Sequence, residues 1–343
     1  FVLIVWPVYN LHIINYPIAR QQSDTTQLLS YYGNTKISKI VIAAAGTPVI
    51  RGLAQYATGL VMADQRVSGG SPAYFFGKIY DFGHWAYFPV VYFIKEPLTW
   101  WALVILALFA FIRRLRALGR PRWLEFAHQH FEELVMAAWV ILYWFISIRG
   151  TLNIGIRHLL PVYGFTFILV AGQITWLWHD ISLRAKKHLR LKVILVTILV
   201  WYGLTAAMAF PYYMAYFNEV VGGPANGYKA VVDSNLDWGQ DLIRFADWVK
   251  NEKLPAISFD YFGWADPGYY LGSKYIWLNS KTFTDAKDFI DKNRSNGWLA
   301  ISATFLQNSP GSPERPVTPN YLWLHNYTPV TAIGHSVFVY HIQ

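Results

Sequence analysis

The sequence predicts a multi-pass α-helical membrane protein with an extracytoplasmic α/β domain at its C-terminus. Of its 343 residues, 54% are hydrophobic, 18% are aromatic and only 14% are charged, against about 25% charged in an ordinary soluble domain. Four long apolar runs follow one another between residues 97 and 210, and each is close to the length that crosses a bilayer. After Pro211 the pattern changes to short alternating helices and strands, which is typical of a small layered domain.

The residues before the first complete run do not form a convincing span. Residues 1–9 are apolar, but so short a helix, at 1.5 Å rise per residue, cannot cross a hydrocarbon core about 30 Å thick. We expect them to be the outer end of a truncated helix. Residues 10–95 are expected to form an extracytoplasmic loop. Within this loop, 40–62 is apolar but is interrupted by glycine, proline and arginine, which predicts a helix along the membrane surface or packed beneath the loop.

Four complete spans are predicted, and the loops between them indicate how they are oriented. The spans cover 97–112, 133–148, 159–178 and 193–210. Two intervening loops hold five cations each: Arg113, Arg114, Arg116, Arg120 and Arg122 in the first, and Arg184, Lys186, Lys187, Arg190 and Lys192 in the second. Loops rich in Lys and Arg stay in the cytoplasm. This places the first loop, the link between the second and third spans and everything after Pro211 outside, for a protein of the plasma (inner) membrane.

The net charge of +9 follows from this topology. The predicted transmembrane region, 1–214, carries 19 Lys/Arg and 8 Asp/Glu, whereas the predicted soluble domain, 215–343, carries 10 and 12. Because the excess of positive charge lies in short connections between apolar runs, we predict no nucleic-acid partner. The chain has no cysteine, which excludes disulfides, thiolate catalysis and Cys-ligated zinc.

The C-terminal domain is expected to mix helices with short strands. The periodicity predicts helices at 241–250 and 285–293, strands at 256–261 and 298–305, and a hairpin over 330–342 that turns near Gly334.

Basic residues at the outer ends of two predicted spans are the first candidate site. Arg157 and His158 lie at the outer mouth of the third span. There they offer donors to a phosphate, while the apolar helix below could hold a lipid tail. The alternative is an arginine that extends toward lipid headgroups. Lys95, at the entrance of the first span, either forms a self-neutralising pair with Glu96 or adds a second positive charge near Arg157.

An acidic run from Asp233 to Asp241 is the second candidate site. If a helix begins at Ser234, Asp237 completes a capping box, which leaves the outer two carboxylates unexplained. With Asn235 beside them, these carboxylates could hold a divalent cation or bind sugar hydroxyls. The spacing is not that of an EF-hand, so no dedicated metal site is predicted.

Several motifs together carry a family resemblance. They are Tyr-Phe-Pro at 87–89, Lys-Glu-Pro at 95–97, Asn-Ile-Gly-Ile-Arg-His-Leu-Leu-Pro at 153–161, Phe-Asn-Glu at 217–219, Gly-Gly-Pro at 222–224 and Asp-Ser-Asn-Leu-Asp-Trp-Gly-Gln-Asp at 233–241. The chain, from about residue 68 to 340, thereby resembles bacterial and archaeal members of the dolichyl-phosphate-mannose protein mannosyltransferase family, which are GT-C membrane glycosyltransferases.

The resemblance implies an enzyme that moves a sugar from a polyprenyl-phosphate donor to a protein, lipid or glycan acceptor at the outer face of the membrane. Arg157, His158 and Lys95 would bind the donor phosphate, and the acidic run would contact the acceptor or act as a structural hinge. The family's catalytic acidic residues lie in the first extracytoplasmic loop. Because Asp24, Asp64 and Asp81 stand alone, we expect the catalytic base upstream of Phe1.

Two other classes of function stay open. A transporter or flippase of lipid-linked sugars would use the same amphipathic ligand, but transporters commonly place polar groups or broken helices at mid-membrane. The predicted spans carry almost no charge at their centres, which favours chemistry at the surface. In a membrane-anchored sugar-binding or assembly protein, the C-terminal domain alone would carry the function.

Overall fold

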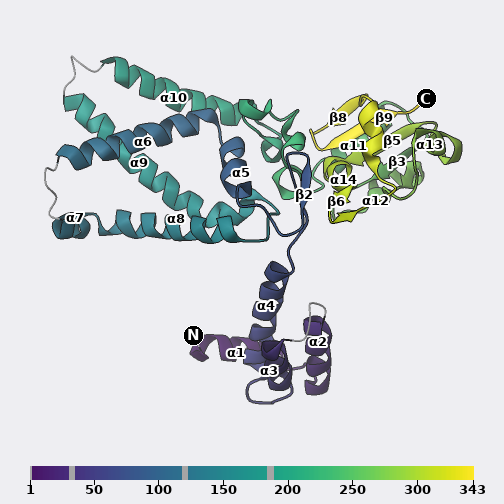
Figure 1. Cartoon of the computed structure of the whole chain (residues 1–343), viewed down its shortest axis with the longest axis horizontal. Helices are drawn as coiled ribbons and strands as arrows, with labels where there is room; N and C mark the ends of the chain where they lie inside the picture. The colour runs from purple at the N-terminus through teal and green to yellow at the C-terminus, as the bar shows by residue number, and fades with distance from the viewer. Residues whose placement is uncertain (1, 31–34, 118–122, 184–188) are drawn as a thin grey trace. The chain divides into compact units, whose positions relative to one another are not determined.

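The computed structural model describes residues 2–30, 35–117, 123–183 and 189–343 (Figure 1). The chain divides into two compact units, one comprising Phe1–Ser71 with Asp81–Gly83 and the other Pro72–Tyr80 with His84–Gln343. The long apolar helices and the C-terminal domain therefore belong to the same unit. Half of the predicted loop cations lie outside the described residues: Arg120, Arg122, Arg184, Lys186 and Lys187.

The described residues of the first unit form four helices, whereas the sequence predicted helix here only at 1–9 and within 40–62. They are α1 (Val2–His12), α2 (Ile18–Ser30), α3 (Lys36–Ala45) and α4 (Arg51–Ser68). Helix α4 packs against the other three. The apolar stretch 40–62 is divided between α3 and α4, and the break falls at its Gly46 and Pro48. The interior of this unit is partly polar: the buried Arg51 donates a hydrogen bond to the carbonyl of Tyr16 at 2.7 Å.

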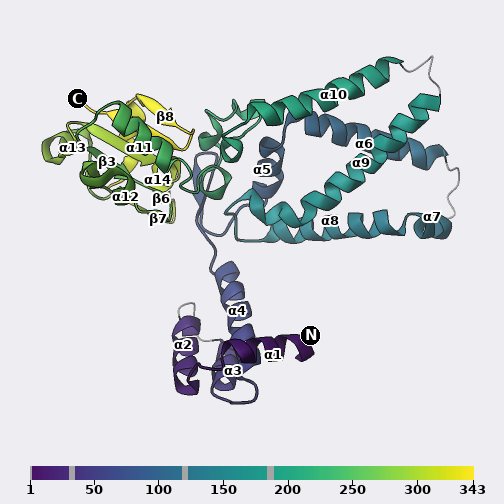
Figure 2. The same ribbon diagram turned by 180° about the vertical axis from the view of Figure 1, so that it is seen from behind.

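Among the described residues of the second unit, four helices are long and apolar enough to cross a membrane, which agrees with the four predicted spans. They are α6 (Leu98–Ala117), α8 (Phe131–Arg149), α9 (Leu160–Leu183) and α10 (Leu189–Met208). Helix α9 packs against α6 and α8, and α10 packs against α6 and α9 (Figure 2). The short α7 (Trp123–Gln129) precedes α8, and the 3-10 helix η1 (Ile156–Leu159) leads into α9.

Short elements connect these helices to the C-terminal domain. Strands β1 (Ala73–Phe75) and β2 (Lys78–Tyr80) form an antiparallel hairpin, and α5 (Tyr87–Lys95) precedes α6. Four 3-10 turns follow α10, namely η2 (Tyr213–Ala215), η3 (Glu219–Val221), η4 (Gly227–Lys229) and η5 (Asp233–Asn235). One apolar core runs from α5 and α9 through these turns into the C-terminal sheet, so the sheet is packed onto the helical part and is not only tethered to it.

The C-terminal sheet has five strands in the order β4-β3-β5-β9-β8. The first three pair in parallel, whereas β9 is antiparallel to both of its neighbours. Their bounds are β3 (Ile257–Asp260), β4 (Tyr275–Trp277), β5 (Trp298–Ser302), β8 (Thr331–Ile333) and β9 (Val337–His341). A two-stranded ladder of β6 (Gly311–Ser312) and β7 (Arg315–Pro316) lies apart from this sheet.

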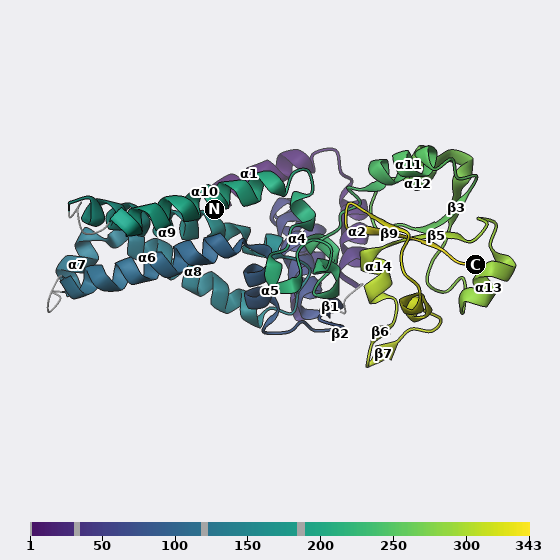
Figure 3. The same cartoon turned by 90° about the horizontal axis from the view of Figure 1, so that it is seen from above.

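Helices cover both faces of this sheet (Figure 3). Along β5, Leu299 and Ile301 join the core that contains α14, while Ala300 between them joins the core beneath α11, as the alternation of side chains along a strand requires. The remaining elements are α11 (Leu242–Asn251), α12 (Pro267–Leu271), η6 (Gly272–Lys274), α13 (Ala286–Lys292), α14 (Ala303–Asn308) and η7 (Tyr321–Asn326). The predicted helices and hairpin of this domain are confirmed, but the strand predicted over 298–305 ends at Ser302, where α14 follows.

Candidate anion-binding site

The predicted site residues come together at one end of the long helices. Lys95 ends α5, Arg157 and His158 lie in η1, and the acidic run begins at η5. These three segments are far apart in the sequence, and direct hydrogen bonds join them in the fold. The two candidate sites are therefore parts of one region.

Asn235 is the residue that joins the three segments. It is 1% exposed, and its side-chain oxygen accepts a hydrogen bond from the backbone N–H of Ile156 at 2.9 Å. Its side-chain nitrogen donates to the Tyr87 hydroxyl at 2.7 Å, and its backbone carbonyl accepts from the Lys95 ammonium at 2.7 Å. A buried amide that loses such hydrogen-bond partners destabilises the fold by about 1–3 kcal/mol. Asn235 therefore stabilises the packing of η1 and α5 against the acidic run.

A close approach at Gly155 supports the same junction. The Ser234 hydroxyl donates to the carbonyl of Ile154, and a Cβ at position 155 would overlap the Ser234 side chain. Only glycine lets the chain before Arg157 lie so near the acidic run.

Arg157 stacks on Trp238 from the middle of the acidic run. The guanidinium carbon lies 4.6 Å from the centroid of the indole ring. Arg157 is half-buried, and Trp238 is 46% exposed. Among the described residues the guanidinium forms no hydrogen bond or ion pair within bonding distance. An aromatic ring holds one face of this planar cation, and its N–H groups remain available as donors. Such a cation is well suited to binding an anion with several oxygens.

Lys95 is engaged more fully than a free surface cation. Its ammonium donates to the carbonyls of Met214 and Asn235 at 2.7 Å each and lies 4.3 Å from the ring centroid of Phe217. Burial lowers the pKa of Lys95 to about 7, although the neighbouring Glu96 opposes the shift. The two carbonyls leave one of three ammonium protons for a ligand. Lys95 thus mainly links α5 to the acidic run through a hydrogen bond.

The acidic run is not helical at its start, so the predicted capping box is wrong. Only Asp233–Asn235 form a 3-10 turn, and α11 begins at Leu242. The Ser234 hydroxyl, which would have capped the helix, bonds to Ile154 instead. Asp233 adopts a left-handed backbone conformation with φ of 57°. The carboxylates therefore do not stack along one helical face.

Two of the three carboxylates lie inside the fold. Asp241 is 1% exposed and pairs with Arg244, while the Ser336 hydroxyl donates to it at 2.7 Å. Asp237 is also 1% exposed, and one of its oxygens accepts from the backbone N–H of Gly239 at 2.8 Å. Burial, with a smaller contribution from Asp241 and Asp233, raises the pKa of Asp237 to about 7. Of the two roles predicted for the run, these contacts support the structural one.

The described residues offer little to a divalent cation. In the part of the chain that the structure covers, no group of three His, Cys, Asp or Glu side chains is placed to hold a metal ion. The Asp241 oxygens are already used by Arg244, Ser336 and Gln240.

His158 and two aromatic residues complete the region. His158 is half-buried beside Arg157, and its carbonyl accepts from the Tyr143 hydroxyl at 2.8 Å. Trp238 and Tyr87 lie within two of the sequence motifs, but no role is predicted for either residue. An aromatic residue between carboxylates could have indicated a contact with the nearby arginine, whereas the bond of Tyr87 to Asn235 depends on the fold alone.

Comparisons with known proteins add no relative. No protein-family model matches the chain, and no curated protein or solved structure matches it at a significant level.

Proposed function

We propose that the protein is a glycosyltransferase of the plasma membrane that moves a sugar from a polyprenyl-phosphate donor to a hydroxyl of a protein, lipid or glycan. The observation that carries this proposal is the guanidinium of Arg157, whose N–H groups form no hydrogen bond to the described residues. It stacks on Trp238 at one end of four helices that are apolar enough to cross a membrane. A polyprenyl phosphate has the matching parts, namely an anionic head and a long apolar chain. The motif resemblance to GT-C mannosyltransferases supports the same assignment.

In this proposal Arg157 stabilises the departing phosphate. When the bond from the anomeric carbon to the carrier oxygen breaks, that oxygen gains negative charge while the sugar gains oxocarbenium character. Fixed donors aimed at such a charge lower the barrier. Arg157 supplies several N–H groups as hydrogen-bond donors, and His158 lies next to it in η1. The Lys95 ammonium supplies the one N–H that does not donate to the carbonyls of Met214 and Asn235. We assign no catalytic base among the described residues.

The proposed topology places the candidate site and the C-terminal domain outside the cell. The loop cations that the structure describes, Arg113, Arg114, Arg116, Arg190 and Lys192, lie at the opposite ends of α6 and α10 from those that lead to the site. Under the rule that basic loops stay in the cytoplasm, transfer would take place at the outer face, with the C-terminal domain beside the acceptor.

A transfer assay separates this proposal from the two other classes of function. The full protein is reconstituted in vesicles with a panel of labelled polyprenyl-phosphate hexoses and an extract of protein, lipid and glycan acceptors. We expect label to become covalently attached to an acceptor. Label that crosses the bilayer without attachment would identify a transporter, and label that stays bound to the protein without transfer would identify a binding protein. Either result would overturn the proposal.

Arginine variants connect the assay to the site. We expect Arg157→Ala to lower transfer about 100-fold, as loss of a transition-state donor typically does. Arg149→Ala is the matched control, because Arg149 also lies at a helix end and stacks on an aromatic ring, Phe145, but has no contact with the acidic run. Equal activity of the two variants would remove the proposed role of Arg157.

A further inference from the structure

A cavity lies between three of the long helices, at the end of the bundle away from the candidate anion-binding site. Its volume is about 300 Å³, and its walls come from α6, α8 and α9 with Phe126 of α7. Most of the lining is aliphatic or aromatic, including Val104, Leu108, Leu134 and Leu169. A space of this size and character is suited to an apolar chain.

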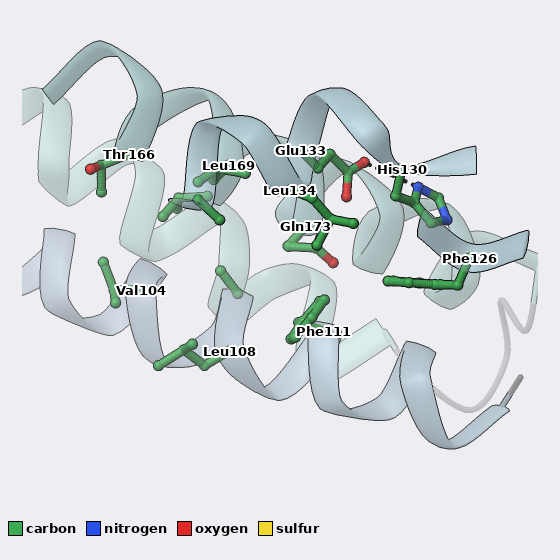
Figure 4. Close-up of a pocket in the computed structure, with 13 residues that line it drawn as sticks. Val104, Leu108, Phe111, Phe126, His130, Glu133, Leu134, Thr166, Leu169 and Gln173 are labelled. Carbon is green, nitrogen blue, oxygen red and sulfur yellow. Dashed lines mark ion pairs between the residues drawn. The ribbon is translucent and has the colours of Figure 1, made fainter. Parts of the chain in front are cut away.

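One end of the cavity is polar (Figure 4). His130, Glu133 and Phe126 line this end. Val104 and Thr166 lie at the opposite end, and Gln173 lies between the two ends. Arg114 approaches the polar end from α6, with its guanidinium 3.2 Å from a ring nitrogen of His130 and 3.8 Å from a carboxylate oxygen of Glu133. A cation and an anion therefore stand side by side there.

Gln173 is the strongest indication of a ligand. It is 8% exposed, and its side-chain oxygen has no hydrogen-bond partner among the described residues. A buried amide oxygen without a donor costs free energy, and the rest of the cavity wall near it is apolar. The natural partner is an N–H or O–H group on a molecule inside the cavity.

We propose that this cavity binds a zwitterionic phospholipid with a primary ammonium headgroup, of the phosphatidylethanolamine class. One acyl chain would occupy the apolar part. The ammonium would donate to the Gln173 oxygen and the Glu133 carboxylate, and the phosphate would face Arg114. A choline headgroup has no N–H to donate. A phosphatidylglycerol phosphate could also face Arg114, but its neutral glycerol hydroxyls would meet the Glu133 carboxylate without the positive charge of an ammonium.

Native mass spectrometry of the full protein tests the headgroup preference. The detergent-purified, delipidated protein is mixed with equal amounts of phosphatidylethanolamine, phosphatidylcholine and phosphatidylglycerol of the same acyl chains. We expect the ethanolamine lipid to be retained about tenfold more than either other lipid, the effect of one charge-assisted hydrogen bond. Equal retention of the three lipids, or retention of none, would overturn the proposal.

Paired variants locate the site. Glu133→Gln and Gln173→Leu should each reduce the ethanolamine preference, whereas Glu132→Gln, an exposed neighbour that does not line the cavity, should not. Ala137→Phe should fill the cavity and remove the bound lipid, whereas Ala138→Phe on the exposed side of α8 should leave it. If Ala137→Phe does not fold, Gln173→Leu decides, because it adds no volume. An undiminished preference in Gln173→Leu would contradict the proposal.

Discussion

Trp238 is the aromatic half of the candidate anion-binding site, and its loss should weaken that site without unfolding the protein. A partly buried cation–π contact contributes about 1 kcal/mol, so we expect Trp238→Ala to weaken the binding of polyprenyl phosphate roughly fivefold. Trp238→Phe should retain most of the affinity. Trp264→Ala is the control, because Trp264 is 97% exposed in the same domain. The stacking would be irrelevant to binding if Trp238→Ala bound as tightly as this control.

Asp237 should make stability depend on pH. Its pKa is about 7 in the fold and about 3.9 in an unfolded chain. Between these values the folded state holds a proton that the unfolded state has lost, so the contribution of Asp237 to stability falls as pH rises from about 4 to 7.

The measurement for Asp237 is the apparent melting temperature of the detergent-solubilised protein across this range. Because Asn cannot ionise, the melting temperature of Asp237→Asn should rise relative to that of the wild type as pH increases. The exposed Asp247→Asn should follow the wild type at every pH. A constant difference between Asp237→Asn and wild type would mean that Asp237 does not titrate in this window.

Residue types indicated the candidate site, but burial did not follow from them. Arg157 and Lys95 could be placed at helix ends because apolar runs define those ends. The acidic run has the residue types of an exposed binding site for a cation or a sugar. Nothing near Asp241 in the sequence shows that Ser336 and Gly334 enclose this carboxylate. Such partners come from a hairpin almost 100 residues later, beyond the reach of local patterns.

At the scale of secondary-structure elements, the contact between η1 and η5 should depend on Gly155. We expect Gly155→Ala to lower the melting temperature and to reduce transfer more than about tenfold, because its Cβ would push η1, with Arg157, away from Ser234. Gly164→Ala is the matched control. Nothing lies within 4 Å of a Cβ there, and alanine favours the helix by about 1 kcal/mol. Similar behaviour of the two variants would show that the close approach is not required.

Long elements could be predicted from the sequence, whereas short ones could not. The four long helices follow from apolar runs that leave no alternative, and α11 and the final hairpin follow from clear periodicity. Strands β1, β2 and β4 and helix α12 have at most five residues each, too few to establish a period. The capping box failed because the Ser234 hydroxyl found a tertiary partner in Ile154, and tertiary contacts override local preference.

At the scale of the whole second unit, a continuous core joins the helices to the sheet. Val162 of α9 and Leu299 of β5 belong to the same buried cluster. The acidic run lies along this junction and holds Arg157 through Trp238. In our account the C-terminal domain is thus part of the site and does not act as an independent binding module.

The proposed topology can be tested by cysteine labelling, since the chain has no cysteine of its own. Ser273 and Gln129 are both exposed, the first in the C-terminal domain and the second before α8. In spheroplasts, a membrane-impermeant maleimide should label Ser273→Cys at once and Gln129→Cys only after permeabilisation. Labelling of both without permeabilisation, or the reverse order, would contradict the topology.

The most direct test of our account is the binding of polyprenyl monophosphate to the protein in nanodiscs. We predict saturable binding that Arg157→Ala weakens by about tenfold to 100-fold, because hydrogen bonds from a charged donor contribute about 1.5–3 kcal/mol. Arg149→Ala should bind like the wild type. Equal affinities for all three proteins would contradict the assignment of Arg157 as the phosphate-binding residue.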